Sequence, residues 1–132
     1  MTTNKTLAQL AEEMGGTQPD AVLITEDSRM VDLNLPADPE HFAEYAAAIL
    51  RCDLVEHVKI APGLHLWVDE EGLGERPPNE FITWFTQNHP HSSALTVHGP
   101  VLVTGHHGDR VAPLDGVDYL QLALAYGPLS TA

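Results

Sequence analysis

The sequence has little cysteine, little positive charge and no long apolar run. Cys52 is the single cysteine, which excludes a disulfide within the chain and a zinc site built on several thiolates. Only 6 of the 132 residues are lysine or arginine, so we expect no basic surface and no direct binding of nucleic acid. No apolar run approaches the roughly 18 residues of a membrane-spanning helix, and residues 1–14 lack a signal-peptide pattern. We therefore expect a soluble, cytoplasmic protein that does not bind membranes.

Acidic side chains dominate the charge. The chain has 19 Asp and Glu residues and a formal net charge of −13. This excess is explained by solubility in a lysine-poor composition, by a basic protein partner, or by a mimic of DNA whose carboxylates replace phosphates. The densest acidic run, residues 69–71, comes before Gly72 and is typical of a hairpin turn, while the other acids are scattered. Scattered acids favour the solubility interpretation over the mimic.

The length and the spacing of apolar residues predict one small α+β domain. We divide the chain into an N-terminal helix and turn at 1–20, a single domain at 21–127 and a tail at 128–132. A mainly antiparallel sheet is expected, with two to four helices packed against one of its faces. Strands are predicted at 21–25, 30–35, 54–61, 64–69, 94–98 and 101–104, with helices at 7–14, 39–51 and from 80 onward. The segments 70–78 and 105–110 are predicted to be loops.

The segment 118–126 fits two structures. Leu120, Leu122 and Leu124 alternate with other residues, which suits a strand. However, the segment has no β-branched residue, it contains two alanines, and Gly127-Pro128 follows as a helix stop. We interpret it as a helix, with a strand as the alternative.

Histidines are numerous and form clusters. The chain has eight of them, and neutral imidazole is the commonest metal ligand in proteins, while a carboxylate can complete a ligand set. The alternative is that these are polar loop residues, and we expect no cofactor on that interpretation. If a transition metal such as zinc binds, the candidate ligands are His89, His91, His98, His106, His107 and Asp109.

Two further histidines lie on the strands of a predicted hairpin. His57 and His65 belong to the segments 54–61 and 64–69, and they can face each other across the sheet. A buried pair would respond to pH, whereas an exposed pair would be inert. We expect an inert pair.

Other chemistry has weaker support. Arg76 precedes Asn79, which is a predicted helix cap, and an arginine beside a helix N-terminus is a candidate anion site. The alternative is a structural arginine that pairs with Glu75 or Glu80. Cys52 follows a helix end, where the dipole raises a thiol pKa, and the serines lack a nucleophile-elbow motif. We therefore assign no catalytic residue.

Three short motifs resemble a known family. A hairpin with an acidic-glycine turn at 55–72 is followed by Pro78-Asn79 before a helix, and then by a Gly-Pro-Val-x-Val-x-Gly pattern at 99–105. This order resembles that of small uncharacterised proteins found in bacteriophages and actinobacteria, over residues 21–110. The resemblance implies a phage or prophage accessory protein and no particular reaction.

These observations predict a non-enzymatic binding module. We expect it to dock on a host protein or to sequester a small ligand, and self-association is compatible with the sequence. One alternative is a metal-binding protein or metal-dependent hydrolase that uses the clustered histidines. The other is an acidic DNA mimic that acts on a DNA-binding protein.

Overall fold

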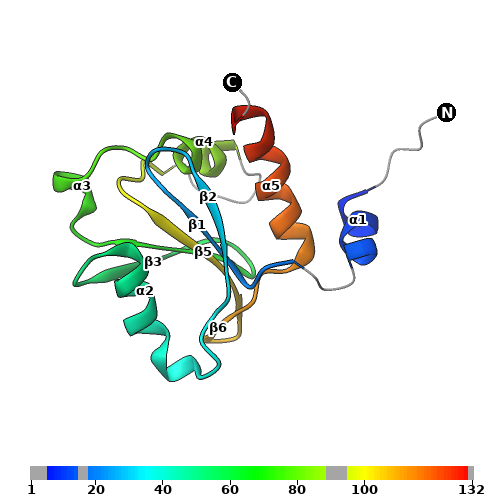
Figure 1. Cartoon of the computed structure of the whole chain (residues 1–132), viewed down its shortest axis with the longest axis horizontal. Coiled ribbons are helices and arrows are strands. Elements are labelled where there is room, and N and C mark those ends of the chain that lie inside the picture. The colour runs from blue at the N-terminus through cyan, green and yellow to red at the C-terminus, as the bar shows by residue number, and fades with distance from the viewer. Residues whose placement is uncertain (1–5, 15–17, 89–94, 131–132) are drawn as a thin grey trace.

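One antiparallel sheet forms the centre of the computed structural model, which describes residues 6–14, 18–88 and 95–130 (Figure 1). Its strand order is β2-β1-β5-β4-β3, and β6 pairs with β5. All five pairings are antiparallel. The predicted α+β class with an antiparallel sheet is confirmed. The strands are β1 (Ala21–Ile24), β2 (Met30–Leu33), β3 (Val55–Ala61), β4 (Leu64–Asp69), β5 (Val101–His107) and β6 (Arg110–Ala112).

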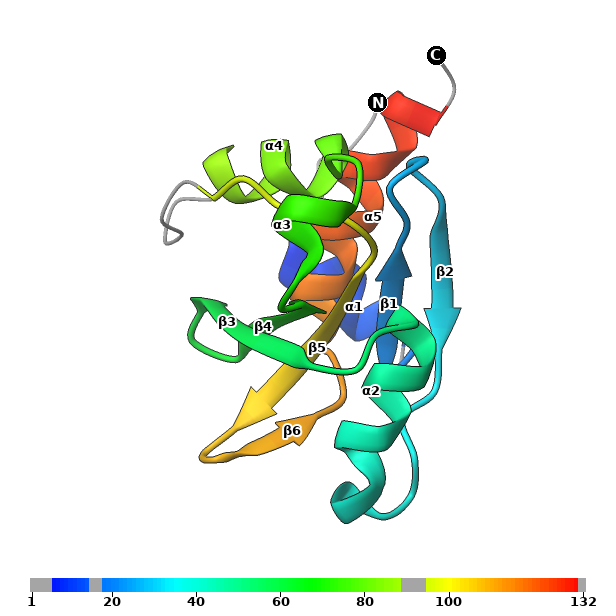
Figure 2. The same cartoon turned by 90° about the vertical axis from the view of Figure 1, so that its left-hand side faces the viewer.

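Helices cover both faces of the sheet. α2 packs on one face, while α4 and α5 pack on the other, so our prediction of helices on a single face is wrong (Figure 2). The described residues form more helices than the two to four expected, partly because a short one lies in the predicted loop 70–78. They are α1 (Leu7–Met14), α2 (Phe42–Leu50), α3 (Gly72–Glu75), α4 (Glu80–Asn88), α5 (Gly116–Ser130) and the 3-10 helix η1 (Pro39–His41).

The two faces bury different amounts of apolar surface. Successive strand residues point to opposite sides, so Val22 and Val103 face α4 and α5, whereas Ala21 and Leu102 face α2. The first face holds the larger core. On the second face, the nine-residue α2 contacts β3, β4 and β5. A helix of that length is about 14 Å long and leaves part of this face open.

The start of α2 follows the local sequence. The carboxylate of Asp38 accepts a hydrogen bond from the Glu40 backbone N–H at 3.0 Å, and Pro39 takes the first position of η1. This is the predicted capping arrangement, displaced by one 3-10 turn. At the other end, Arg51 adopts a left-handed conformation with φ 55°. The Asp38 cap and the left-handed conformation of Arg51 mark the two ends of this helical segment.

The sequence pattern misplaced the strands near residue 100. Instead of a strand at 94–98, the described residues 95–97 have no regular structure, and His98 forms an isolated bridge to Pro78. The predicted loop at 105–110 is also wrong, because β5 continues to His107 and pairs with β6. A Cβ atom at Gly105 would lie 2.2 Å from the Pro113 carbonyl oxygen, so the close approach of this backbone requires glycine. Glycine and histidine are not typical strand residues. The sequence pattern therefore did not predict that β5 continues past residue 104.

The C-terminal segment is helical, as interpreted, but α5 is longer than expected. The helix continues through Gly127-Pro128 to Ser130, so the predicted stop is wrong. Propensity is a weak guide where tertiary context decides. α5 packs against α1 and α4. Among the described residues, no helix has both the length and the apolar composition needed to cross a membrane.

Candidate metal centre

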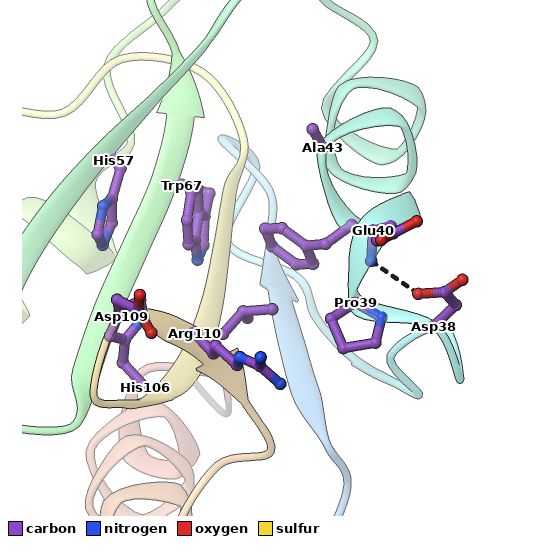
Figure 3. A pocket seen from close by; sticks show the side chains of 11 residues that line it. Asp38, Pro39, Glu40, Ala43, His57, Trp67, His106, Asp109 and Arg110 are labelled. Carbon is purple, nitrogen blue, oxygen red and sulfur yellow. Dashed lines mark hydrogen bonds between the residues drawn. The ribbon is translucent and has the colours of Figure 1, made fainter.

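A groove of about 780 Å³ opens on the α2 face of the sheet (Figure 3). Strands β3, β4 and β5 form its floor. One wall comes from η1 and the start of α2, and the other comes from β6 and the turn that joins it to β5. The lining residues are Asp38, Pro39, Glu40, Phe42, Ala43, His57, Trp67, His106, Asp109, Arg110 and Val111.

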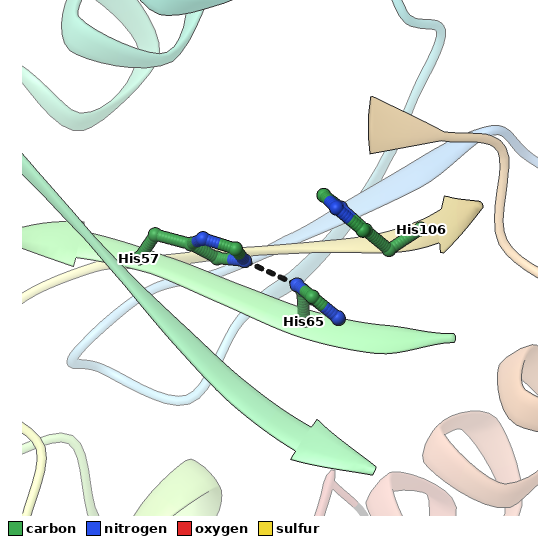
Figure 4. A group of neighbouring side chains, drawn as sticks. All are labelled: His57, His65 and His106. Carbon is green, nitrogen blue, oxygen red and sulfur yellow. Dashed lines mark hydrogen bonds between the residues drawn. The ribbon is translucent and has the colours of Figure 1, made fainter. Parts of the chain in front are cut away.

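Three histidines from adjacent strands lie close together (Figure 4), and two of them, His57 and His106, line the groove. His57 on β3 pairs opposite Trp67 on β4, two residues from His65. His65 in turn pairs opposite Thr104 on β5, two residues from His106. Side chains two residues apart share a face, so the register places the three imidazoles in one diagonal row.

The ring nitrogens of His57, His65 and His106 lie close enough to hold one ion. One nitrogen from each ring lies within 4.8 Å of the other two, and His57 Nε2 is hydrogen-bonded to His65 Nδ1. The ligands of a tetrahedral zinc ion with Zn–N bonds of about 2.0–2.1 Å lie roughly 3.4 Å apart. The nitrogens are therefore close enough for one ion once the rings turn their lone pairs toward it.

The imidazole rings stack on one another and on Trp67. Trp67 and His57 lie 4.2 Å apart between ring centres, with 8° between their planes. The rings of His65 and His106 lie 3.9 Å apart at 4°, and His57 contacts His65 at 4.5 Å. The lone pairs of parallel imidazoles lie in parallel planes and cannot meet at one point. At least one ring must leave the stack when an ion binds.

The environment lowers the pKa of two of these imidazoles. Burial, helped by His106, His57 and Lys59, lowers the pKa of His65 to about 4, and only 6% of this residue is exposed. Burial and His106 also lower the pKa of His57. Neutral imidazole is the form that binds metals. In addition, the buried Nδ1 of His106 has no hydrogen-bond partner among the described residues.

The aromatic wall of the groove is held in place. The indole N–H of Trp67 donates to Thr104 Oγ1 at 2.8 Å. Phe42 meets the Trp67 ring edge-on, with ring centres 4.7 Å apart and an interplanar angle of 64°. With its polar atom bonded to the sheet, Trp67 offers only apolar surface to the groove.

The cluster contains one of the six metal ligands that the sequence predicts. His106 joins the cluster, and Asp109 lines the groove without belonging to the group of three. His107 is exposed, and His98 lies by the Arg76 carbonyl oxygen with its Nδ1 at 3.0 Å, outside the cluster. His89 and His91 lie outside the described residues.

Sequence reasoning paired His57 with His65 but did not recognise them as ligands. Their spacing across the predicted hairpin was the available signal, and the structure confirms that they face each other. The third member was not found because the predicted strand ended at 104, so His106 was assigned to a loop. His65 is also buried, which does not agree with the expected inert, exposed pair.

The anion candidates make structural contacts. The Arg76 guanidinium donates to Asp69 Oδ2 at 2.7 Å and to the carbonyl oxygens of Leu50 and Arg51 at 3.2 and 2.7 Å. Its partner is Asp69, in place of the Glu75 or Glu80 that the sequence suggested. Asn79 is fully buried and caps α4, as predicted. These contacts favour structural roles for both residues over anion binding.

Comparison with known proteins returns no match. No family model matches the chain, and neither a curated protein nor a solved structure is significantly similar to it. The function is therefore argued from the geometry of the groove.

Proposed function

We propose that this chain is a metal-binding protein that holds one transition-metal ion with His57, His65 and His106. One observation carries the proposal: three imidazole nitrogens from three adjacent strands lie within 4.8 Å of one another. Two of these side chains, His57 and His106, line a groove of about 780 Å³. A site of this kind is accessible to an ion from solvent while being held by the sheet.

The ligand set indicates which ions fit. Imidazole nitrogens suit zinc, copper, iron and nickel, whereas magnesium and calcium prefer oxygen ligands. Three protein ligands with a further position free is the composition of metal sites that accept an exogenous molecule. Of the alternatives drawn from the sequence, the geometry thus favours metal binding. Docking on a host protein, mimicry of DNA and the phage-type resemblance stay predictions.

The test is metal stoichiometry in protein made without a histidine tag. After incubation with Zn²⁺ or Co²⁺ and dialysis, we expect about one ion per chain by elemental analysis. His106→Gln should weaken binding by more than the roughly 10–100-fold that loss of an outer partner of a metal ligand costs. His41→Gln and His107→Gln are matched controls, because both side chains are exposed and outside the cluster.

A second variant separates loss of ligand from loss of fold. His65 is buried, so its replacement can unfold the chain, whereas His57 is exposed and is replaced with less risk. Circular dichroism should show that His57→Gln and His106→Gln keep the native fold. Sub-stoichiometric metal in the unmodified protein would overturn the proposal, as would equal loss of binding in the control variants.

A further inference from the structure

The position of the three histidines determines on which side a bound ion has free coordination positions. All three side chains rise from the sheet, which occupies one side of the site. His57 and His106 line the groove, whereas His65 is buried beneath it. An ion held by these rings therefore has its remaining coordination positions on the groove side.

Charge decides what can approach those positions. The groove is lined by three carboxylates, Asp38, Glu40 and Asp109, and by one guanidinium, Arg110. Without an ion this lining is net negative and repels anions. A divalent ion held by neutral imidazoles balances the excess. An anion should therefore bind only after the metal.

The other residues that line the groove indicate which kind of ligand body fits. Phe42, Trp67 and Val111 give the groove an apolar side beside the histidines. Among the described residues, Arg110 forms no salt bridge, and Figure 3 shows its guanidinium extending from the turn toward the Pro39 side of the groove. The groove volume of about 780 Å³ lies within the range of about 300–1,000 Å³ for small-molecule sites.

Resting on the proposed metal site, we infer that the groove binds a small organic carboxylate with an apolar or aromatic body. The carboxylate would bind to an ion held by His57, His65 and His106. Arg110 would donate hydrogen bonds to the carboxylate, and the body would lie against Trp67 and Phe42. A monoanion fits better than a dianion, because one guanidinium faces three carboxylates. The chain then sequesters its ligand through the metal.

The test uses three probes with the same ring and different charge: benzoate, benzyl alcohol and benzylammonium. The protein carries Trp84→Phe, a change at an exposed position that leaves Trp67 as the only tryptophan. We expect benzoate to change the visible spectrum of bound Co²⁺ and the fluorescence of Trp67. The same additions to metal-free protein should have no effect on fluorescence.

Arg110→Gln provides the specificity control. It should weaken benzoate binding about tenfold or more, as expected for hydrogen bonds to a charged group, while Co²⁺ still binds. Arg29→Gln is the matched control, because Arg29 lies outside the groove and pairs with Asp27.

The outcomes separate this inference from the proposed function. If Co²⁺ binds but benzoate changes neither signal, the carboxylate inference is wrong and the metal site stands. Stronger binding of benzylammonium, equal benzoate binding without metal, or no effect of Arg110→Gln would each overturn the inference. If Co²⁺ does not bind, the proposed function itself fails.

Discussion

Asn79 shows how one buried side chain can hold three segments together. Its amide group donates to the carbonyl oxygens of Ile24 and Gly99 at 3.0 and 2.9 Å. Its Oδ1 accepts the backbone N–H of Ile82 at 3.3 Å and so caps α4. Buried carbonyls left without donors are costly, so this residue links β1, α4 and the segment before β5.

We predict that Asn79→Ala lowers the free energy of unfolding by about 2–4 kcal/mol, from two unsatisfied carbonyls and a lost cap. Urea denaturation followed by circular dichroism measures the loss. Asn88→Ala is the control, because Asn88 is exposed at the end of the same helix. A loss at Asn79 no larger than at Asn88 would contradict a structural role and reopen this residue as an anion ligand.

Asp118 predicts a pH effect on stability. Burial, with a smaller contribution from Asp115, raises its pKa from 3.8 to about 6. The folded chain therefore holds this proton more tightly than the unfolded chain. The contribution to stability is fully present below pH 3.8 and is lost as pH rises through 6.

Asp118→Asn should therefore raise the melting temperature at pH 7 and change it little at pH 4. Thermal unfolding at the two pH values measures this difference. Asp53→Asn is the control for removing one carboxylate, because Asp53 is exposed. A stabilisation by Asp118→Asn that is equal at pH 4 and pH 7 would contradict the raised pKa.

At the scale of elements, Arg76 fixes the end of α2 to the end of β4. Its guanidinium bonds the last carbonyls of α2 and the carboxylate of Asp69, which is 8% exposed. α2 carries Phe42, which packs on Trp67 in the groove. The position of one wall of the groove thus depends on a contact at the opposite end of this helix.

We predict that Arg76→Lys destabilises the fold by about 1–3 kcal/mol, because a lysine cannot make the forked contacts of a guanidinium. Hydrogen exchange should accelerate in α2 more than in α5, because the hydrogen bonds of the Arg76 guanidinium go to the end of α2 and to Asp69. Arg29→Lys, at an exposed ion pair, is the control and should have little effect. Uniform acceleration over both helices would show that Arg76 does not act on α2 specifically.

At the scale of the whole molecule, the larger hydrophobic core and the candidate site lie on opposite faces of the sheet. The larger core lies between the sheet and the helices α4 and α5. The face covered by α2 keeps part of its strands open, and the histidines and the groove are there. This division allows polar rings to gather on the sheet without interrupting the main core. Among the described residues that line the groove, Arg110 is the only arginine or lysine, in a chain with a net charge of −13.

Local sequence patterns predicted the features that depend on neighbouring residues. The alternation at 64–69, the cap residues Asp38 and Asn79 and the turn at Gly63 all report local backbone preferences. They were enough to predict an α+β domain with an antiparallel sheet, because periodicity states which side of an element is buried.

The candidate site depends on contacts between segments that are distant in the chain. The histidine cluster depends on β4 pairing with β5, two strands far apart in the chain, in a register that sets His65 opposite Thr104. It also depends on β5 continuing past Gly105, where the nearby Pro113 carbonyl leaves no room for a side chain. Hydrogen bonding between distant segments determines both, and no local pattern of residues records which distant strand a segment will meet.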